Sequence, residues 1–243
     1  MSALYDRIGR SYIATRSEDP RIAAIIHAAL GDARTVLNVG AGTGSYEPRD
    51  RDVTAVEPSA VMRAQRPRGA APCIDARAEA LPFADGVFDA TMAVLSDHHW
   101  EDRLGGLREL RRVGRRAVVF QWNPAHADAF WLTRDYLPSF PGSQRVSLAQ
   151  TEAALGTTRS VPVPIPHDCR DGFLMAYWRR PEAYLDPDVR ANISVFSLLP
   201  QSEVDAMVVA LRADLAGGEW QCRNAALLEL DELDFGYRVL VAE

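Results

Sequence analysis

The chain of 243 residues carries 27 basic and 33 acidic side chains, for a formal net charge of −6, and 47% of its residues are hydrophobic. This length and composition predict one globular domain with enough apolar side chains for a core. The acidic balance and the lack of a basic run disfavour nucleic acid as a partner. Every basic residue is an arginine, which excludes mechanisms that need a lysine, such as a Schiff base or a phosphate-binding Gly-Lys-Ser/Thr loop.

The cysteines Cys73, Cys169 and Cys222 are odd in number and widely spaced. They form neither a disulfide framework nor a zinc-ligand pattern, so no metal is expected. The first residues, "MSALYDRIGRSY", contain no apolar run typical of a signal peptide. No segment approaches the roughly 20 apolar residues of a membrane span. We therefore expect a cytoplasmic protein without a membrane partner, and the pattern does not specify an oligomeric state.

Helices and strands alternate along the first half of the chain. Residues 19–32 predict a helix, because Ile22, Ile25, Ile26 and Leu30 recur at intervals of three and four. Buried strands are predicted at residues 35–39, 53–57, 72–75, 88–95 and 116–122, with a helix at 101–113 between the last two. Continuous apolar strands that alternate with helices are typical of a parallel sheet covered on both faces.

The second half has a different pattern. Residues 160–168, "SVPVPIPHD", carry prolines at alternate positions, which favours an edge strand or an extended segment. A helical, aromatic-rich stretch follows, and residues 235–243 predict a final strand. The sequence therefore predicts an α/β fold: a Rossmann-like, mostly parallel seven-stranded sheet with helices on both faces. We expect a single domain spanning 1–243, with a helical cap inserted at roughly 170–222.

A glycine-rich loop follows the first strand. Gly40, Gly42 and Gly44 lie at the end of a parallel sheet where ligands bind, and glycine allows a ligand to approach the backbone closely. Glu57 closes the second strand at the same edge, where a carboxylate can accept hydrogen bonds from both hydroxyls of a ribose. The spacing is G-x-G-x-G rather than the G-x-G-x-x-G of dinucleotide sites. The next residues leave little room for a helix, so a ligand without phosphates is favoured.

The segments "VLNVGAGTGSYE", "VEPS", "ARAEALPFADGVFDA" and "LSDHHWED" occur in this order. Together they resemble the class I S-adenosylmethionine-dependent methyltransferases, the type 11 branch in particular, over roughly residues 5–122. The resemblance implies S-adenosylmethionine as cofactor. It implies a cofactor site formed by Tyr12, Arg16, Asn38, Gly40, Gly42, Gly44, Glu57, Pro58, Ser59, Ala78, Glu79, Leu95 and Ser96.

The resemblance also implies a role for each part of that site. Asn38 and the glycine loop would pack against the methionine part, and Tyr12 and Arg16 would fold over its carboxylate. Glu57 would hold the ribose, with Pro58, Ser59, Ala78 and Glu79 along the adenine. Leu95 and Ser96 would face the sulfonium. The sequence departs from the family at Arg77, which replaces the usual aspartate, and in the shortened helix after the glycine loop.

Methyl transfer needs orientation and exclusion of water more than a conspicuous catalytic residue. A base matters if the acceptor is a hydroxyl. The candidate bases are His98 and His99, which follow the fourth strand, and His167, which follows the proline-rich segment. Each has an alternative, purely structural interpretation in packing or capping. The adjacent His167 and Asp168 face opposite ways on an extended chain and are not expected to act as a dyad.

Aromatic residues are dense around the fifth strand and the insertion. Trp122, Phe130, Trp131, Tyr136, Phe173, Tyr177 and Trp178 form this group. They either form the core of the cap or line an apolar acceptor pocket, and both interpretations can hold for different residues.

We therefore predict a methyltransferase that acts on a small-molecule acceptor, such as a secondary metabolite, under a helical cap. The alternatives are a non-catalytic or non-methylating protein that binds the same cofactor, and an NAD-dependent oxidoreductase on the same kind of sheet. The identity of the acceptor and of its reacting atom does not follow from the sequence, because one fold serves many acceptors.

Overall fold

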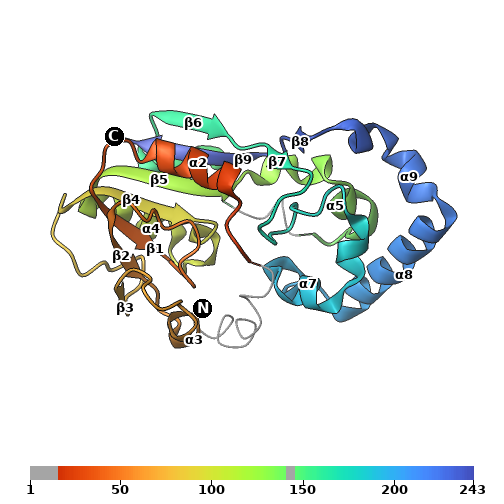
Figure 1. Cartoon of the computed structure of the whole chain (residues 1–243), viewed down its shortest axis with the longest axis horizontal. Coiled ribbons are helices and arrows are strands. Elements are labelled where there is room, and N and C mark those ends of the chain that lie inside the picture. Colours follow the sequence, from red (N-terminus) through yellow and green to blue (C-terminus); the bar gives the residue numbers. More distant parts are fainter. Residues whose placement is uncertain (1–15, 141–145) are drawn as a thin grey trace.

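The computed structural model describes residues 16–140 and 146–243, so the predicted site residue Tyr12 lies outside the described residues. Its main sheet has seven strands in the order β3-β2-β1-β4-β5-β9-β6 (Figure 1). The strands are β1 (Thr35–Val39), β2 (Asp52–Val56), β3 (Cys73–Ile74), β4 (Phe88–Val94), β5 (Gly114–Trp122), β6 (Arg159–Pro162) and β9 (Tyr237–Ala242). The first five strands are parallel, and β9 runs antiparallel between β5 and β6. This arrangement confirms the predicted mostly parallel seven-stranded sheet.

Both faces of the sheet are buried, and the side chains of each central strand alternate between them. Val36 and Val118 contribute to one core cluster, together with Ile22 and Ile26 of helix α2 (Pro20–Ala29). Their neighbours Leu37 and Val119 contribute to the other cluster, together with the buried leucines of helix α4 (Arg103–Val113). Burial on both faces explains why these strands read as continuous apolar runs.

The remaining elements near the sheet are short. Helix α3 (Ala60–Ala64) follows β2, and helix α6 (Leu148–Leu155) precedes β6 and contacts α4. No helix forms between β1 and β2, where the structure has turns, so the prediction of little room for one is confirmed. Strand β6 lies at the edge of the sheet, a position that tolerates its proline because the missing N–H faces no partner strand.

A group of helices lies beside the main sheet, toward the end at which the parallel strands finish (Figure 1). It includes the short 3₁₀ helices η3 (Pro124–Ala129), η5 (Pro181–Leu185), η6 (Ser194–Ser197) and η7 (Ala225–Glu229), and the α-helices α5 (Trp131–Tyr136), α7 (Pro187–Ala191), α8 (Gln201–Gly217) and α9 (Glu219–Arg223). We call these elements the helical lobe. A two-stranded sheet of β7 (Ile165–Pro166) and β8 (Glu232–Leu233) flanks the part of the lobe that lies between β6 and β9 in the sequence. Within the described residues, no helix combines the length and apolarity needed to cross a membrane.

Aromatic side chains form the core of the helical lobe. Trp131, Trp178, Tyr184 and Trp220 are all at most 1% exposed. The indole ring of Trp131 packs edge-on against Tyr184 and Trp220, with ring centroids 5.7 and 5.2 Å apart. The indole N–H groups of Trp131 and Trp178 each donate to a backbone carbonyl. This interlocked core gives the lobe a defined shape beside the sheet.

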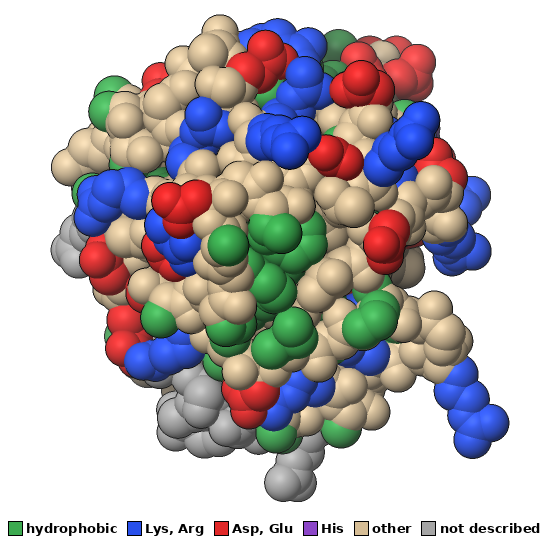
Figure 2. Space-filling view, turned by 90° about the vertical axis from the view of Figure 1, so that its left-hand side faces the viewer, with side chains coloured by type: hydrophobic (Ala, Val, Ile, Leu, Met, Phe, Trp, Pro, Cys, Tyr) green, Lys and Arg blue, Asp and Glu red, His purple; other side chains and the backbone are tan. Residues whose placement is uncertain are grey.

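Arginine and acidic side chains alternate on the face of the molecule shown in Figure 2, around a small hydrophobic patch. Many of the described arginines form ion pairs with neighbouring carboxylates, among them Arg63 with Asp75 and Arg112 with Asp85. No continuous basic surface is visible among the described residues on this face. This pattern agrees with the overall acidic charge of the chain.

Candidate functional site

The glycine loop after β1 lies at the point where the strand order reverses, between β1 and β4. The N–H groups of Gly40 and Ala41 both donate to the carbonyl of Val56, which bends the loop toward the end of β2. Gly40 has φ +67°, and a Cβ atom there would lie 2.7 Å from Cβ of Ser96. A side chain is therefore excluded both by conformation and by the close approach of the loop after β4.

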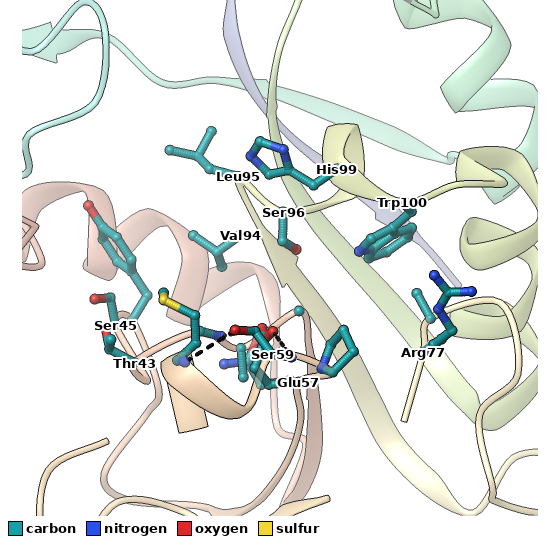
Figure 3. A pocket seen from close by; sticks show the side chains of 18 of the residues that line it. Thr43, Ser45, Glu57, Ser59, Arg77, Val94, Leu95, Ser96, His99 and Trp100 are labelled. Carbon is teal, nitrogen blue, oxygen red and sulfur yellow. Dashed lines mark hydrogen bonds between the residues drawn. The ribbon is translucent and has the colours of Figure 1, made fainter. Parts of the chain in front are cut away.

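Glu57 follows β2, and its side chain returns to the glycine loop. Its two carboxylate oxygens accept hydrogen bonds from the N–H groups of Gly42 and Ser59, at 2.9 and 2.8 Å (Figure 3). The residue is only 8% exposed, and this burial raises the pKa of its carboxyl despite the two N–H donors. Each oxygen keeps a further lone pair, so the fixed carboxylate can accept two more hydrogen bonds.

A first cavity, of about 1010 Å³ including its open mouth, lies between these elements. Its lining comprises Arg16, Asn38, Gly40, Ala41, Gly42, Thr43, Ser45, Tyr46, Glu57, Pro58, Ser59, Met62, Arg77, Ala78, Glu79, Val94, Leu95, Ser96, His99, Trp100 and Glu101. In Figure 3, Glu57 and Ser59 lie on one side of this cavity, and Leu95 and His99 lie on the opposite side. The cavity therefore has the carboxylate of Glu57 on one side, and the apolar side chain of Leu95 and the imidazole of His99 on the other.

Leu95 lies directly after β4, where the first cavity meets a second one. It adopts φ +49°, which is unusual for a residue with a side chain, and its N–H donates to the carbonyl of Phe120 at 2.8 Å. Strain of this kind costs about 1–3 kcal/mol and is concentrated at functional sites. Leu95, His99 and Arg16 line both cavities, so these three residues mark the junction.

The second cavity, of about 870 Å³ including its open mouth, extends from this junction toward the helical lobe. Its lining comprises Arg16, Leu95, Asp97, His98, His99, Arg103, Gln121, Trp122, Pro124, Phe140, Phe173, Leu174, Asn192, Ile193, Ser194, Val195 and Tyr237. Most of these side chains are apolar or aromatic, as in typical small-molecule pockets. The lining comes from the ends of β4 and β5, the starts of α4 and β9, the helical lobe and segments next to these elements.

A buried polar cluster lies in the wall of the second cavity. Arg103 donates from Nε to Oδ2 of Asp97 at 2.8 Å, and from Nη2 to Oε1 of Gln121 at 2.5 Å. Asp97 and Gln121 are 0% and 2% exposed. Burial alone would raise the pKa of the Asp97 carboxyl, but His98 and the Arg103 cation together hold it below its usual value. Asp97 is therefore a stable carboxylate at neutral pH rather than a proton acceptor.

The structure brings most of the predicted cofactor residues together. The first cavity is lined by Arg16, Asn38, Gly40, Gly42, Glu57, Pro58, Ser59, Ala78, Glu79, Leu95 and Ser96. Gly44 does not line it. A Cβ atom on Gly44 would instead lie 3.1 Å from Glu47 and 3.2 Å from Arg66, so Gly44 serves the turn behind the cavity wall.

The three candidate histidines lie in different places. His99 lines both cavities, and His98 lines the second. The two imidazole rings are 3.8 Å apart between centroids. His167 is half-buried and lines neither cavity, and its Nδ1 lies 3.2 Å from the carbonyl oxygen of Asp231. The structure therefore groups His98 and His99 but not His167.

Both interpretations of the aromatic residues hold, each for a different subset. Phe130, Trp131 and Trp178 are buried in the core of the helical lobe. Trp122 and Phe173 line the second cavity. Periodicity could not separate the two subsets, because a buried core residue and a pocket residue are both apolar.

Several lining residues were not identified from the sequence. Trp100 and Arg77 line the first cavity, and Asp97, Arg103 and Gln121 line the second. Asp97 lies directly before the predicted His98, and Gln121 lies near the carboxyl end of β5, so position at the ligand-binding edge was a usable signal. Arg103 had no such signal, because it lies in the first turn of an ordinary amphipathic helix.

Both a family model and a solved structure match this chain. A family model described as "Methyltransferase domain" matches residues 37–120. A solved structure from Anabaena variabilis, assigned as a methyltransferase of an antibiotic biosynthesis pathway, is 32% identical with a TM-score of 0.85, and the match covers 94% of this chain and 99% of that one. This likeness extends over the sheet and the helical lobe alike.

Two curated relatives match over shorter regions. A malonyl-[acyl-carrier protein] O-methyltransferase from Erwinia pyrifoliae is 41% identical over 36% of this chain. A tRNA (carboxymethyluridine(34)-5-O)-methyltransferase, alkbh8, from Xenopus tropicalis is 27% identical over 70% of this chain. The matches span only 36% and 28% of the lengths of these relatives. The relatives thus act on different kinds of acceptor while sharing this region.

Proposed function

Because this chain belongs to the class I S-adenosylmethionine-dependent methyltransferases, we propose that it methylates a small molecule held in the second cavity, beneath the helical lobe. The cofactor of the family is S-adenosylmethionine. The observation that carries the proposal is the junction formed by Leu95 and His99, which connects a cavity suited to the cofactor with an apolar cavity suited to an acceptor.

The residues of the first cavity fit this cofactor. Any side chain on Gly40 would collide with Ser96, so the glycine loop and the loop after β4 lie close together where both line the cavity. Glu57 is fixed by two N–H donors and keeps lone pairs for two hydroxyls, which is the requirement for holding a ribose. No phosphate-binding helix follows the loop, in agreement with a ligand that lacks a pyrophosphate.

We assign roles to the other lining residues on the same basis. Pro58 and Ser59 follow Glu57 directly, and together with Ala78 and Glu79, which line the same cavity, they would border the adenine. Asn38 and Gly42 would contact the methionine part. Arg16 lines both cavities and would meet the cofactor's carboxylate. Leu95 and Ser96 would face the sulfonium.

The bound cofactor would supply an electrophilic methyl group, and the chain would supply orientation and a dry environment. The walls of the second cavity hold the acceptor against the junction and exclude water. His99 is the candidate base, because its imidazole is at the junction and can take a proton from a hydroxyl acceptor. His98 supports this position through its ring contact with His99. An amine or thiolate acceptor would not need this proton transfer.

A small-molecule acceptor agrees with the acidic charge of the chain and with the mixed charges seen on one face in Figure 2. A nucleic-acid substrate requires cations that neutralise phosphates. The similarity to a tRNA methyltransferase over 70% of this chain makes tRNA the second candidate acceptor. The experiment must therefore include both low-molecular-weight metabolites and tRNA as acceptors.

Calorimetry with S-adenosylmethionine and a labelling assay with methyl-labelled cofactor test the proposal. We expect the protein to bind the cofactor and to label a fraction of low-molecular-weight metabolites, and we expect Glu57→Ala to bind at least tenfold more weakly. Glu182→Ala, which replaces an exposed glutamate of the helical lobe, is the matched control. Label in the tRNA fraction alone would overturn the small-molecule proposal, and unchanged affinity in Glu57→Ala would overturn the ribose assignment.

A further inference from the structure

The second cavity contains two buried polar atoms that have no hydrogen-bond partner among the described residues. These are Oδ1 of Asp97 and Nε2 of Gln121. Both side chains line the cavity, and both are at least 98% buried. A buried polar group without a partner costs about 1–3 kcal/mol, so such atoms in a cavity wall point to a ligand that completes their hydrogen bonds.

Arg103 fixes the orientation of both atoms. It donates to Oδ2 of Asp97 and to Oε1 of Gln121. Nδ1 of His98 lies 3.9 Å from Oδ1 of Asp97, beyond hydrogen-bond distance, so Oδ1 and Nε2 remain without a hydrogen-bond partner among the described residues. The amide of Gln121 cannot be reversed, because its N–H₂ would then face the arginine donor. The wall thus presents one fixed acceptor, Oδ1, and one fixed donor, Nε2.

The charges of this wall are balanced. Asp97 pairs with Arg103, and Arg16 pairs with the buried Asp171, at an Nε–Oδ1 distance of 2.5 Å. An acidic ligand would meet the Asp97 carboxylate without an unpaired cation, and a cationic ligand would compete with Arg103. The rest of the cavity is rich in aromatic and aliphatic side chains, including Trp122, which is 5.7 Å from Phe140 between ring centroids.

We propose that Asp97 and Gln121 are the specificity anchor for the methyl acceptor, which is an uncharged, largely apolar molecule bearing a hydroxyl or carboxamide. Such a group donates to Oδ1 of Asp97 and accepts from Nε2 of Gln121. The anchor positions the acceptor and takes no proton. This inference rests on the proposed function, since it assumes that the second cavity holds the acceptor.

Binding of four naphthalene probes tests the anchor, with S-adenosylhomocysteine at saturation and affinities measured by ligand-observed NMR. The probes are naphthalene, 2-naphthol, naphthalene-2-carboxamide and naphthalene-2-carboxylate. We expect the hydroxyl and carboxamide probes to bind roughly tenfold more tightly than naphthalene, because each satisfies two buried groups. The carboxylate should bind no better than naphthalene.

The variant Gln121→Met removes the donor at nearly constant volume, and Gln121→Glu replaces it with an oxygen while keeping an acceptor for Arg103. Both should reduce the preference for the carboxamide over naphthalene to about twofold or less and leave naphthalene affinity within about twofold. The control is Gln221→Met, because Gln221 also has a buried, unpartnered oxygen but lines neither cavity. Its probe preferences should match those of the wild type.

The anchor would be overturned if the carboxylate bound as tightly as the hydroxyl and carboxamide probes or more tightly, or if the carboxamide preference were unchanged in both Gln121 variants. Calorimetry with S-adenosylhomocysteine separates this failure from that of the proposed function. If the wild type binds S-adenosylhomocysteine but shows no preference for the hydroxyl or carboxamide probe, only the anchor is wrong. If S-adenosylhomocysteine does not bind, the proposed function fails first.

Discussion

Arg16 and Asp171 form an ion pair across 155 positions of sequence, and Tyr46 donates from its hydroxyl to the second oxygen of the same carboxylate at 2.9 Å. One buried carboxylate thus joins the segment before α2, the loop after β1 and the segment after β7. Asp171 is only 1% exposed. Since Arg16 and Tyr46 line the first cavity, the Asp171 carboxylate holds two residues of that cavity's wall in place.

We predict that Asp171→Ala lowers the free energy of unfolding by about 3–5 kcal/mol, because it removes a buried carboxylate that pairs with Arg16 and accepts from Tyr46. S-adenosylmethionine affinity should fall as well, since two lining residues lose a shared anchor. Chemical denaturation and calorimetry measure the two effects. Asp168→Ala is the control, because Asp168 pairs with Arg21 at the surface with both side chains about half exposed, and such pairs contribute at most about 1 kcal/mol. Equal effects for the two variants would contradict the role given to Asp171.

Binding of S-adenosylmethionine should weaken in mildly acidic solution. Burial raises the pKa of Glu57 above the ordinary 4.5, so protonation begins at a higher pH than for an exposed carboxyl. The protonated form loses lone pairs that the ribose hydroxyls need. Below the raised pKa, affinity should therefore fall by up to tenfold per pH unit, as measured by calorimetry between pH 7 and 5.

The same titration in Glu57→Gln provides the comparison. An amide cannot accept from both Gly42 and Ser59, because its N–H₂ must face one of these donors. The variant should bind weakly at every pH and show a flatter dependence. A slope identical to that of the wild type would assign the titration to another group.

Replacement of Arg103 by methionine should destabilise the protein by about 3–5 kcal/mol at neutral pH, because the fully buried Asp97 carboxylate then lacks its cation. In the wild type the pKa of Asp97 is lowered. Its ionised form therefore stabilises the fold above the ordinary pKa of 3.8, and this contribution is lost as the pH falls through the lowered pKa. In Arg103→Met the pKa of Asp97 should rise instead, so that part of the lost stability returns as the pH falls.

Denaturation curves between pH 7 and 5 test this reversal of sign. Arg115→Met is the control, because Arg115 is 75% exposed in its pair with Asp89 and should contribute little. A deficit of the Arg103 variant that is constant across this pH range would show that lost packing, rather than the unpaired charge, is responsible.

Gly40→Ala should lower the free energy of unfolding by more than the unfavourable backbone conformation of Gly40 alone explains. Gly40 and Gly86 have similar φ angles of +67° and +61°, but a Cβ atom on Gly40 would lie 2.7 Å from Ser96, whereas one on Gly86 would meet nothing within 4 Å. Gly86→Ala therefore measures the conformational cost, about 1 kcal/mol. The additional loss of unfolding free energy in Gly40→Ala, measured by denaturation, reports the steric conflict between the glycine loop and the loop after β4.

Cofactor affinity should separate the same two variants. Gly86→Ala should leave S-adenosylmethionine affinity within about twofold, because Gly86 lines neither cavity. Gly40→Ala should reduce it at least tenfold, because the loop backbone must move. Similar affinity in both variants would remove Gly40 from the proposed cofactor site.

The sequence by itself determined the sheet, the glycine loop and the carboxylate opposite it. These features depend on local signals: apolar runs that become buried strands, glycines directly behind one strand, and an acid directly behind the next. Parallel strands place their carboxyl ends at one edge, so Gly40, Glu57 and Leu95 could be brought together without knowledge of the tertiary structure.

Only the tertiary structure decided how the second cavity is built. The cluster of Asp97, Arg103 and Gln121 joins a loop, a helix and a strand, and Arg16 meets Asp171 across most of the chain. Hydrophobic periodicity specifies which face of an element is buried, but it does not specify which polar side chains meet within that buried region. The first cluster depends on how α4 packs beside β4 and β5, and the second pair depends on how the segment after β7 meets the segment before α2, and so the polar wall of the cavity appears only in the folded chain.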